Sequence, residues 1–317
     1  MGEHCPSWDR VDAELGWWGV PLALLAGAIR ISTPFLFVSL GECLTERSGR
    51  INLGLEGSLV LGAMSAYAVS YLTGSPWLGV LAAGGAGMAL GGLHAWICGH
   101  PRVNDIAAGI ALMIFGTGLA FFLGKPYIQP VAPRLPAIDV GAWSSIPQVR
   151  DALQVNALFL VCLALAPLLT FVLRRTRWGL VVRTVGDSRD AALALGFHVN
   201  RVRALCTMIG GFLAGVGGSF LSLYYPGSCN EGLSSGQGLM AVALVVFARW
   251  EPLRCLYAAL LFGAAGALGP ALQSVGITSG YYLFNVAPYV LTLLLMLATC
   301  SPARALAGMP QELGAGK

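Results

Sequence analysis

The chain has 317 residues, of which 56% are hydrophobic and only 11% are charged, and its mean hydropathy is +0.72. Soluble domains carry about 25% charged residues, so the fifteen acidic and nineteen basic side chains cannot cover a globule of this size with a water-facing surface. The same scarcity of charge excludes a disordered chain, a disulfide scaffold and a nucleic-acid-binding protein. We therefore expect a polytopic membrane protein.

Runs without Asp, Glu, Lys or Arg predict the membrane spans. The two longest, 57–101 and 255–303, each hold two spans of the ~20 residues that cross ~30 Å of hydrocarbon, and turn signals at 73–76 and 274–280 divide them. With the shorter runs they predict about nine spans, the seventh short like a broken or re-entrant helix: 31–46, 53–72, 77–98, 104–123, 152–173, 204–225, 237–249, 255–273 and 281–300. Trp17–Ala28 either adds a tenth span or lies in the membrane interface.

The expected fold is an all-α, polytopic membrane helix bundle, because the apolar runs lack the alternation of a membrane β-barrel. We expect one transmembrane domain over 1–317, with an N-terminal tail at 1–16 and a long polar loop at 174–203. Two glycine sets with helical spacing favour tight packing inside one subunit over a dimerisation motif: Gly84, Gly87 and Gly91, and Gly211, Gly215 and Gly218.

The loop at 174–203 sets the expected orientation, because it holds seven of the nineteen basic residues. The positive-inside rule assigns it to the cytoplasm, which across nine spans puts the N-terminus outside and the C-terminus inside. The N-terminal tail is acidic and lacks the positive region of a signal peptide, so we expect no such peptide.

A short helix is expected within this loop, capped by Asp187 or Ser188 and ended by Gly196. One interpretation is a cationic anchor that lies on anionic lipid headgroups. The other is a docking helix for a cytoplasmic partner, since the small-residue sequence Asp190-Ala191-Ala192 would fit into a cleft.

Two polar stretches broken by glycines, 41–57 and 227–238, precede the second and seventh spans. Glu56 stands just before 45 residues without charge, so its carboxylate should face a protein interior or an aqueous cavity. The alternative is a charge at a helix start that the helix dipole favours. Because the two spans run in opposite directions, the breaks are typical of discontinuous helices in an inverted repeat, with ordinary turns as the alternative.

Sequence motifs exclude some binding and catalytic functions and leave others as alternatives. The chain lacks a Gly-x4-Gly-Lys-Ser/Thr sequence and so does not bind ATP through a P-loop, and its Cys and His residues lack metal-site spacing. Residues 232–236 match G-x-S-x-G, but an intramembrane hydrolase would need Ser234 or Ser235 beside a histidine; the candidates are His94, His100 and His198. An ion-coupled secondary transporter is another alternative, and its proton or sodium sites would be Glu42, Glu56 or Asp105.

Glu46-Arg47-Ser48-Gly49, followed by Asn-Leu-Gly-Leu-Glu-Gly at 52–57, resembles a signature of permease subunits of bacterial ABC importers. The resemblance is to the branched-chain amino acid/ribose superfamily, in its nucleoside and simple-sugar branch. It extends through 177–196, 236–247 and 287–292. The chain departs from the family at Asn104-Asp105, where Asn-Gln is usual and an acid could alter substrate preference, and at 1–16.

The resemblance implies a permease subunit in the bacterial inner membrane, with no cofactor in this chain and with ATP and Mg in a partner ATPase. A second homologous permease would complete a heterodimer, and a basic-membrane-protein-type binding protein would deliver the substrate outside. ATPase closure would move the loop and switch access to the pathway. The implied substrates are purine nucleosides or bases, then simple sugars or a flavin-type vitamin.

Two sets of residues are candidates for these roles. The ATPase-coupling set that the resemblance implies is Arg177, Gly179, Asp190, Ala191, Ala192 and Gly196. The pathway set consists of polar residues near helix breaks: Asn52, Glu56, Asn104, Asp105 and Gln237. Each pathway residue has an alternative role as a helix cap or in an interhelical hydrogen bond.

Overall fold

The computed structural model describes residues 19–100, 102–127, 131–141, 149, 153–227, 233–273, 286–288, 290, 291, 294 and 308–314. Its elements in chain order are α1 (Gly19–Arg47), α2 (Leu55–Thr73), α3 (Pro76–Ile97), α4 (Asp105–Gly124), the 3-10 helix η3 (Lys125–Tyr127), β1 (Ala137–Asp139), β2 (Gln154–Asn156), α6 (Ala157–Arg175), α7 (Arg177–Asp187), α8 (Arg189–Ala194), α9 (Val199–Leu223), α10 (Gln237–Phe247), α11 (Pro252–Gln273) and α15 (Gln311–Gly314).

The prediction of an all-α polytopic bundle is confirmed. Within the described part of the chain, seven helices are long and apolar enough to cross a membrane: α1, α2, α3, α4, α6, α9 and α11. The expected seventh span is the shorter apolar helix α10, of 11 residues. The expected ninth span at 281–300 lies mostly outside the described residues.

Three of the predicted boundaries change. Gly19–Ala28 is neither a tenth span nor a separate interfacial helix, because it continues into the first span as one 29-residue helix, α1. Helix α6 begins at Ala157 rather than at 152, since Gln154–Asn156 pairs as an antiparallel strand with β1 and the Asn156 side chain caps the helix. Helix α9 begins at Val199 rather than at 204, so its first turns carry arginines.

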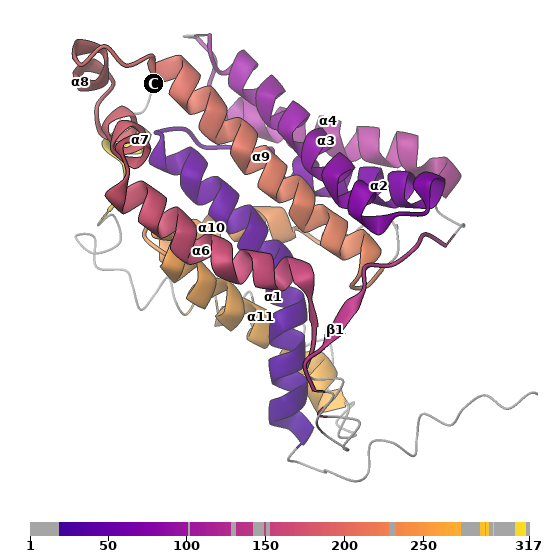
Figure 1. Cartoon of the computed structure of the whole chain (residues 1–317). Coiled ribbons are helices and arrows are strands. Elements are labelled where there is room, and N and C mark those ends of the chain that lie inside the picture. Colours follow the sequence, from indigo (N-terminus) through magenta and orange to yellow (C-terminus); the bar gives the residue numbers. More distant parts are fainter. Residues whose placement is uncertain are drawn as a thin grey trace, which may run out of the picture.

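Close helix approaches form the centre of the bundle, where α9 lies beside α1, α2 and α3 (Figure 1). Gly87 lies directly against the Gly211 carbonyl of α9, and a Cβ on Gly91 would lie 2.7 Å from the Thr207 carbonyl oxygen. Gly62 of α2 packs against Gly215 of α9 in the same way. The interpretation of both glycine sets as packing within one subunit is therefore confirmed.

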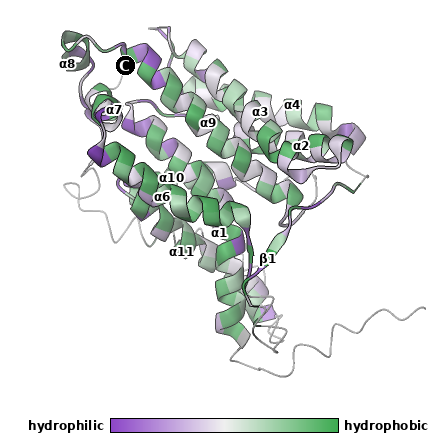
Figure 2. Cartoon of the chain, in the orientation of Figure 1, coloured by the Kyte–Doolittle hydropathy of each residue, from purple (hydrophilic) through white to green (hydrophobic). Residues whose placement is uncertain are grey.

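The two ends of the bundle differ in polarity. Helices α7 and α8 lie at one end together with the C-terminal segment, and the β1–β2 pair lies at the opposite end (Figure 1). Hydrophilic residues gather around α7 and the first turns of α9, whereas the long helices are hydrophobic along most of their length (Figure 2). This distribution is typical of helices whose outer faces contact lipid.

Candidate functional site

The first turns of α2 and α10 meet at one carboxylate. The Glu56 Oε2 atom accepts hydrogen bonds from the backbone N–H groups of Gly238, at 2.6 Å, and Leu239, at 3.2 Å. Glu56 itself lies in the first turn of α2 and is only 7% exposed. Because unpaired N–H groups and the positive dipole end of a helix both favour an anion, the carboxylate stabilises two helix starts at once.

The backbones of the two helices approach so closely that only glycine fits at the contact. A Cβ on Gly238 would lie 2.5 Å from Glu56 Oε2 and 2.7 Å from Glu56 Cα. Gly236, just before α10, adopts a left-handed conformation with φ of 78°, which glycine tolerates. The two glycine-broken stretches singled out in the sequence are therefore neighbours in space. Glu56 both faces the protein interior and lies at a helix start, where the helix dipole favours its charge.

A cavity of about 540 Å³ opens beside Glu56 between α2, α4 and the residues before α10. It is lined by Glu56, Val60, Met113, Ile114, Thr117, Gly118, Phe121, Leu233 and Ser234. Glu56 is the member of the predicted pathway set that lines it. Sequence reasoning missed Thr117 and Gly118, because they lie in the charge-free part of α4, which shows no helix break at these positions.

Asn52 lies next to this site and shapes the start of α2. Its backbone N–H donates to Glu42 Oε1 at 2.8 Å, and its side-chain oxygen accepts from the Gly54 N–H at 3.0 Å. Among the described residues, three buried side-chain atoms near the two breaks have no hydrogen-bond partner: Glu42 Oε2, Asn52 Nδ2 and Gln237 Oε1. Such groups are costly in an interior unless water or a ligand reaches them.

The far end of α10 is also fastened to a carboxylate of α1. The Trp250 indole N–H donates to Glu46, and the Arg47 guanidinium donates to the Trp250 carbonyl oxygen at 2.8 Å. Arg249 and Trp250 have φ values of 52° and 55°, a left-handed conformation that non-glycine residues adopt only when their surroundings impose it. Helix α10 is thus held by a glutamate at each end.

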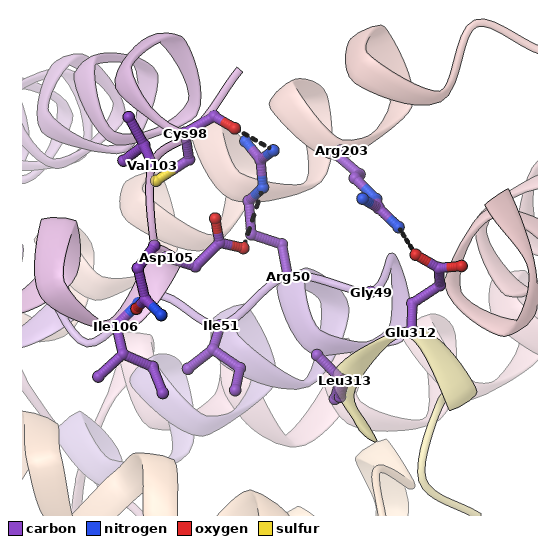
Figure 3. A pocket seen from close by; sticks show the side chains of 11 residues that line it. Gly49, Arg50, Ile51, Cys98, Val103, Asp105, Ile106, Arg203, Glu312 and Leu313 are labelled. Carbon is purple, nitrogen blue, oxygen red and sulfur yellow. Dashed lines mark hydrogen bonds and ion pairs between the residues drawn. The ribbon is translucent and has the colours of Figure 1, made fainter. Parts of the chain in front are cut away.

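Asn104 and Asp105 lie in a different place from Glu56. Asn104 caps α4, because its side-chain oxygen accepts from the N–H groups of Ile106 and Ala107. Asp105 pairs with Arg50 at 3.4 Å, and the Arg50 guanidinium also donates to the carbonyl oxygen of Cys98 (Figure 3). It donates to the Ala95 carbonyl oxygen as well. Neither residue lines the cavity beside Glu56; both line a separate pocket of about 150 Å³ that also contains Arg203 and Glu312.

Burial governs the electrostatics of this pocket. It lowers the pKa of Arg50, an effect that the nearby Asp105 carboxylate opposes. It raises the pKa of the Cys98 thiol to about 12, and Asp105 adds to that rise. Arg50 therefore depends on its carbonyl partners and on Asp105 for its place in the protein.

The loop between α6 and α9 folds into two short helices, α7 and α8. The expected capped helix is α8, and its cap is Ser188, whose side chain accepts from the Ala191 N–H. Gly196 follows in a left-handed conformation with φ of 80°, the expected C-terminal stop.

The six residues of the expected coupling set divide by exposure. Arg177, Asp190, Ala191 and Gly196 are exposed. Ala192 is fully buried and packs with Val185 and Val199 inside the loop, so its small size does not serve insertion into a partner's cleft. Gly179 is buried against Leu173 of α6, where a Cβ would meet the α6 backbone.

Two exposed leucines on this loop escaped the sequence analysis. The side chains of Leu193 and Leu195 are 52% and 65% exposed at the polar end of the bundle. The hydrophobic periodicity of the sequence does not reveal them, because Leu193 lies in α8 and Leu195 directly follows it, and this six-residue helix is too short to show a reliable period.

The structure does not support the hydrolase alternative. Ser234 lines the cavity with Glu56, whereas His94 lies at the end of α3, with its Nε2 atom 3.5 Å from the Cys98 sulfur. Within the described residues, no group of three or more His, Cys, Asp or Glu side chains could hold a metal ion.

The family of the "branched-chain amino acid transport system / permease component" matches residues 17–300, almost the whole chain. The chain belongs to this permease family. As an ABC importer permease subunit for a small solute, it is a multi-pass protein of the inner membrane and a transport subunit rather than an enzyme. This membership leaves the ion-coupled secondary transporter without support.

Three relatives are similar over most of their length. The chain is 36% identical to the putative glucose ABC transporter permease protein TsgC13 of Haloferax volcanii, over 80% of this chain and 79% of the relative. It is 30% identical to the guanosine ABC transporter permease protein NupQ of Bacillus subtilis, over 87% and 89%. It is 28% identical to the nucleoside ABC transporter permease protein NupC of Lactococcus lactis, over 86% and 90%. No solved structure matches the chain significantly.

Proposed function

We propose that this permease translocates a purine nucleoside or nucleobase through the cavity beside Glu56, with simple sugars and flavin-type vitamins as the next candidates. The observation that carries the proposal is the meeting of α2 and α10 at a buried carboxylate that lines a cavity of about 540 Å³. Discontinuous helices whose ends meet near the middle of the bilayer are a common construction of transport sites.

The chemistry of the lining supports a flat, partly apolar solute with hydrogen-bond donors. Val60, Met113 and Phe121 offer apolar contact, while the Glu56 carboxylate and the Ser234 and Thr117 hydroxyls offer polar contact. Cavities of roughly 300–1,000 Å³ with few polar groups are typical of small-molecule sites. Two of the three relatives above are named for nucleosides and one for glucose, which supports the same order of candidates.

The exposed side of the α7–α8 loop is the proposed dock for the ATPase, which would bind ATP and Mg. Leu193 and Leu195 present apolar side chains at a polar end of the protein, where a partner would bury them. Asp190 of α8 and Arg177 of α7 are exposed on the same loop. We infer that closure of the ATPases moves this loop and switches access to the cavity.

A second, homologous permease is proposed to cover the exposed face of α4 and complete a heterodimer. Ile110, Ile114, Phe115 and Phe122 are exposed on this helix, and Ile114 also lines the cavity. Lactococcus lactis has both NupC and another nucleoside permease, NupB, which is 24% identical over 43% of this chain. Substrate delivery by an extracytoplasmic binding protein of the basic-membrane-protein type is part of the same proposal.

The proposed orientation has the N-terminus outside and the C-terminus inside. The seven basic residues of 174–203 and the polar C-terminal segment share one end of the bundle, which supports a cytoplasmic location for that end. Helix α10, about 16 Å long, then spans only the inner half of the ~30 Å hydrocarbon core.

Uptake by the complete importer in proteoliposomes tests this function. We expect guanosine to accumulate only with hydrolysable ATP and with the ATPase present, and glucose to accumulate more slowly. Guanosine uptake that proceeds without any ATPase would contradict the proposal, and a preference for glucose would contradict its substrate order.

A further inference from the structure

The C-terminal segment at 308–314 lies against the α7–α8 loop and joins it to the membrane bundle. Glu312 of α15 makes two contacts with its carboxylate: Oε1 accepts from the Arg189 backbone N–H at 2.9 Å, and Oε2 accepts from the Arg203 guanidinium at 3.1 Å (Figure 3). Arg189 is the first residue of α8, and Arg203 lies in α9. One carboxylate therefore links the start of the expected coupling helix to a membrane span.

Arg203 extends this link to two further backbones. Its guanidinium donates to the Ser48 carbonyl oxygen, at 3.1 Å, and to the Val185 carbonyl oxygen of α7, at 3.4 Å. The Arg203 side chain is only 6% exposed and that of Glu312 is 21% exposed, so water screens the pair weakly. The buried Arg203 guanidinium thus contacts the turn after α1, the end of α7 and the C-terminal segment at the same time.

The fit around this ion pair is close. A Cβ on Gly49 would lie 3.0 Å from both the Arg203 guanidinium and Glu312 Cβ, and Gly186 of α7 lies directly against the Arg47 carbonyl oxygen. A displacement of α7 or α15 would therefore also displace the turn that leads into α2.

The other end of the C-terminal segment touches the turn after α10. A Cβ on Gly308 would lie 3.3 Å from the Arg249 carbonyl oxygen, and Met309 and Leu313 pack against the main hydrophobic core. Arg249 precedes Trp250, which fastens the end of α10 to Glu46. The segment therefore spans the distance between the α7–α8 loop and the short helix whose start contacts Glu56.

We propose that the C-terminal segment is a coupling strap, in which Glu312 positions α8 against α9 so that movement of the α7–α8 loop reaches α10. The proposal rests on the assignment of that loop as the ATPase dock. Glu312 is a positioning residue, and it is not among the residues that line the cavity beside Glu56.

The test uses the assembled importer with Glu312→Ala, Glu312→Gln and the control Glu251→Gln. Glu251, in the turn between α10 and α11, also forms ion pairs, with Arg174 at 2.6 Å and Arg254 at 2.8 Å, but these pairs do not include α8. Hydrogen exchange of the 189–194 amides reports whether α8 is held, and solute imported per ATP hydrolysed reports coupling.

In Glu312→Ala we expect exchange in α8 to rise about fivefold and uptake per ATP to fall about fivefold. Glu312→Gln, which keeps the size and an acceptor for the Arg189 N–H, should fall between Glu312→Ala and the unmodified protein. Glu251→Gln should match the unmodified protein in the exchange of the α8 amides.

Unchanged α8 exchange, or unchanged uptake per ATP, in Glu312→Ala would overturn the strap. An equal rise in α8 exchange in Glu251→Gln would also overturn it, because the loss of any nearby ion pair would then suffice to loosen α8. Failure of the proposed dock is recognised separately, since in that case the double variant Leu193→Glu/Leu195→Glu would still retain the ATPase during purification.

Discussion

Glu56 Oε2 lies 2.6 Å from the backbone nitrogen of Gly238, and this contact brings together two helix starts that are 182 residues apart in the chain. Each helix start alone would leave N–H groups without partners inside the membrane, where no water is available to satisfy them. The Glu56 carboxylate satisfies two of these N–H groups in α10, favours the dipole of α2 from its first turn, and lines the cavity.

Replacement of Glu56 should affect transport more than assembly. Glu56→Gln keeps the shape but loses the charge that favours both helix dipoles, and Glu56→Ala leaves two buried N–H groups unsatisfied. We expect Glu56→Ala to lower the free energy of unfolding by about 2 kcal/mol and to reduce ATP-driven uptake by at least about tenfold, with Glu56→Gln between. Uptake normalised to the amount of assembled complex is the measurement, and unaltered uptake in Glu56→Ala would refute the role of Glu56.

Gly238→Ala tests the close contact of the helix starts directly. The added methyl group would overlap Glu56, so α10 must shift, with an expected loss of about 1–3 kcal/mol in stability. Gly85→Ala in α3 is the matched control, because a Cβ there meets nothing within 4 Å. Thermal unfolding in detergent should show a lower Tm for Gly238→Ala alone; equal Tm values for the two variants would contradict the observed approach.

Polar replacements of the exposed leucines should detach the ATPase. Leu193→Glu combined with Leu195→Glu puts charge into the proposed dock without disturbing the loop, since both side chains are already exposed. We expect the permease to insert and fold, but ATPase co-purification to fall by about tenfold, as for the loss of a central apolar contact. Retention of the ATPase by the double variant would move the dock elsewhere.

Bulky replacements of Ala192 or Gly196 also remain expected to abolish uptake while the complex still inserts, but for another reason than the sequence indicates. Ala192 is buried between Val185 and Val199, so Ala192→Leu would distort α8 itself. Normal ATP-coupled uptake by Ala192→Leu in proteoliposomes would contradict the importance of this loop.

Asp105→Asn separates a structural role from a role in substrate choice. Asp105 pairs with the buried Arg50, so its loss removes a counter-charge from a buried guanidinium and should lower stability by roughly 2–3 kcal/mol, but it lies outside the cavity beside Glu56. The ratio of guanosine to glucose uptake should stay the same. A change in that ratio would support the earlier expectation that this acid alters substrate preference.

The sequence predicts much of the fold because each membrane-spanning helix needs a long run of apolar residues without charge. The charge-free runs locate eight of the nine expected segments as helices in the described residues, including the short α10. The errors have local causes: the polar first turns of α9 hide its true start, and the β1–β2 pairing delays the start of α6.

The site could be predicted only in part. Glu56 and the glycines before α10 stand out because polar and breaking residues are rare in such a chain, and the structure brings them together. In the sequence, Asn104 and Asp105 are polar residues beside a helix break, as Glu56 is. In the structure, however, Asn104 caps α4 and Asp105 pairs with Arg50. The partners of Glu312 and Trp250 could not be foreseen, because these contacts join residues more than a hundred positions apart.

Thiol labelling of Gly118→Cys tests most directly whether the solute passes beside Glu56. A Cβ on Gly118 meets nothing within 4 Å, and Gly118 lines the cavity. The five described cysteines are free and buried, and the raised pKa of the Cys98 thiol, about 12, keeps that group unreactive at neutral pH. Cys5, Cys229 and Cys300 would be replaced by serine, and Gly85→Cys on α3 would serve as the control.

We predict that a bulky, charged thiol reagent on Gly118→Cys reduces ATP-driven uptake by at least about tenfold, because the adduct fills a small-molecule cavity. Saturating substrate should slow that labelling, and labelled Gly85→Cys should transport normally. Full uptake by the labelled Gly118→Cys importer would contradict the account and place the pathway elsewhere in the protein.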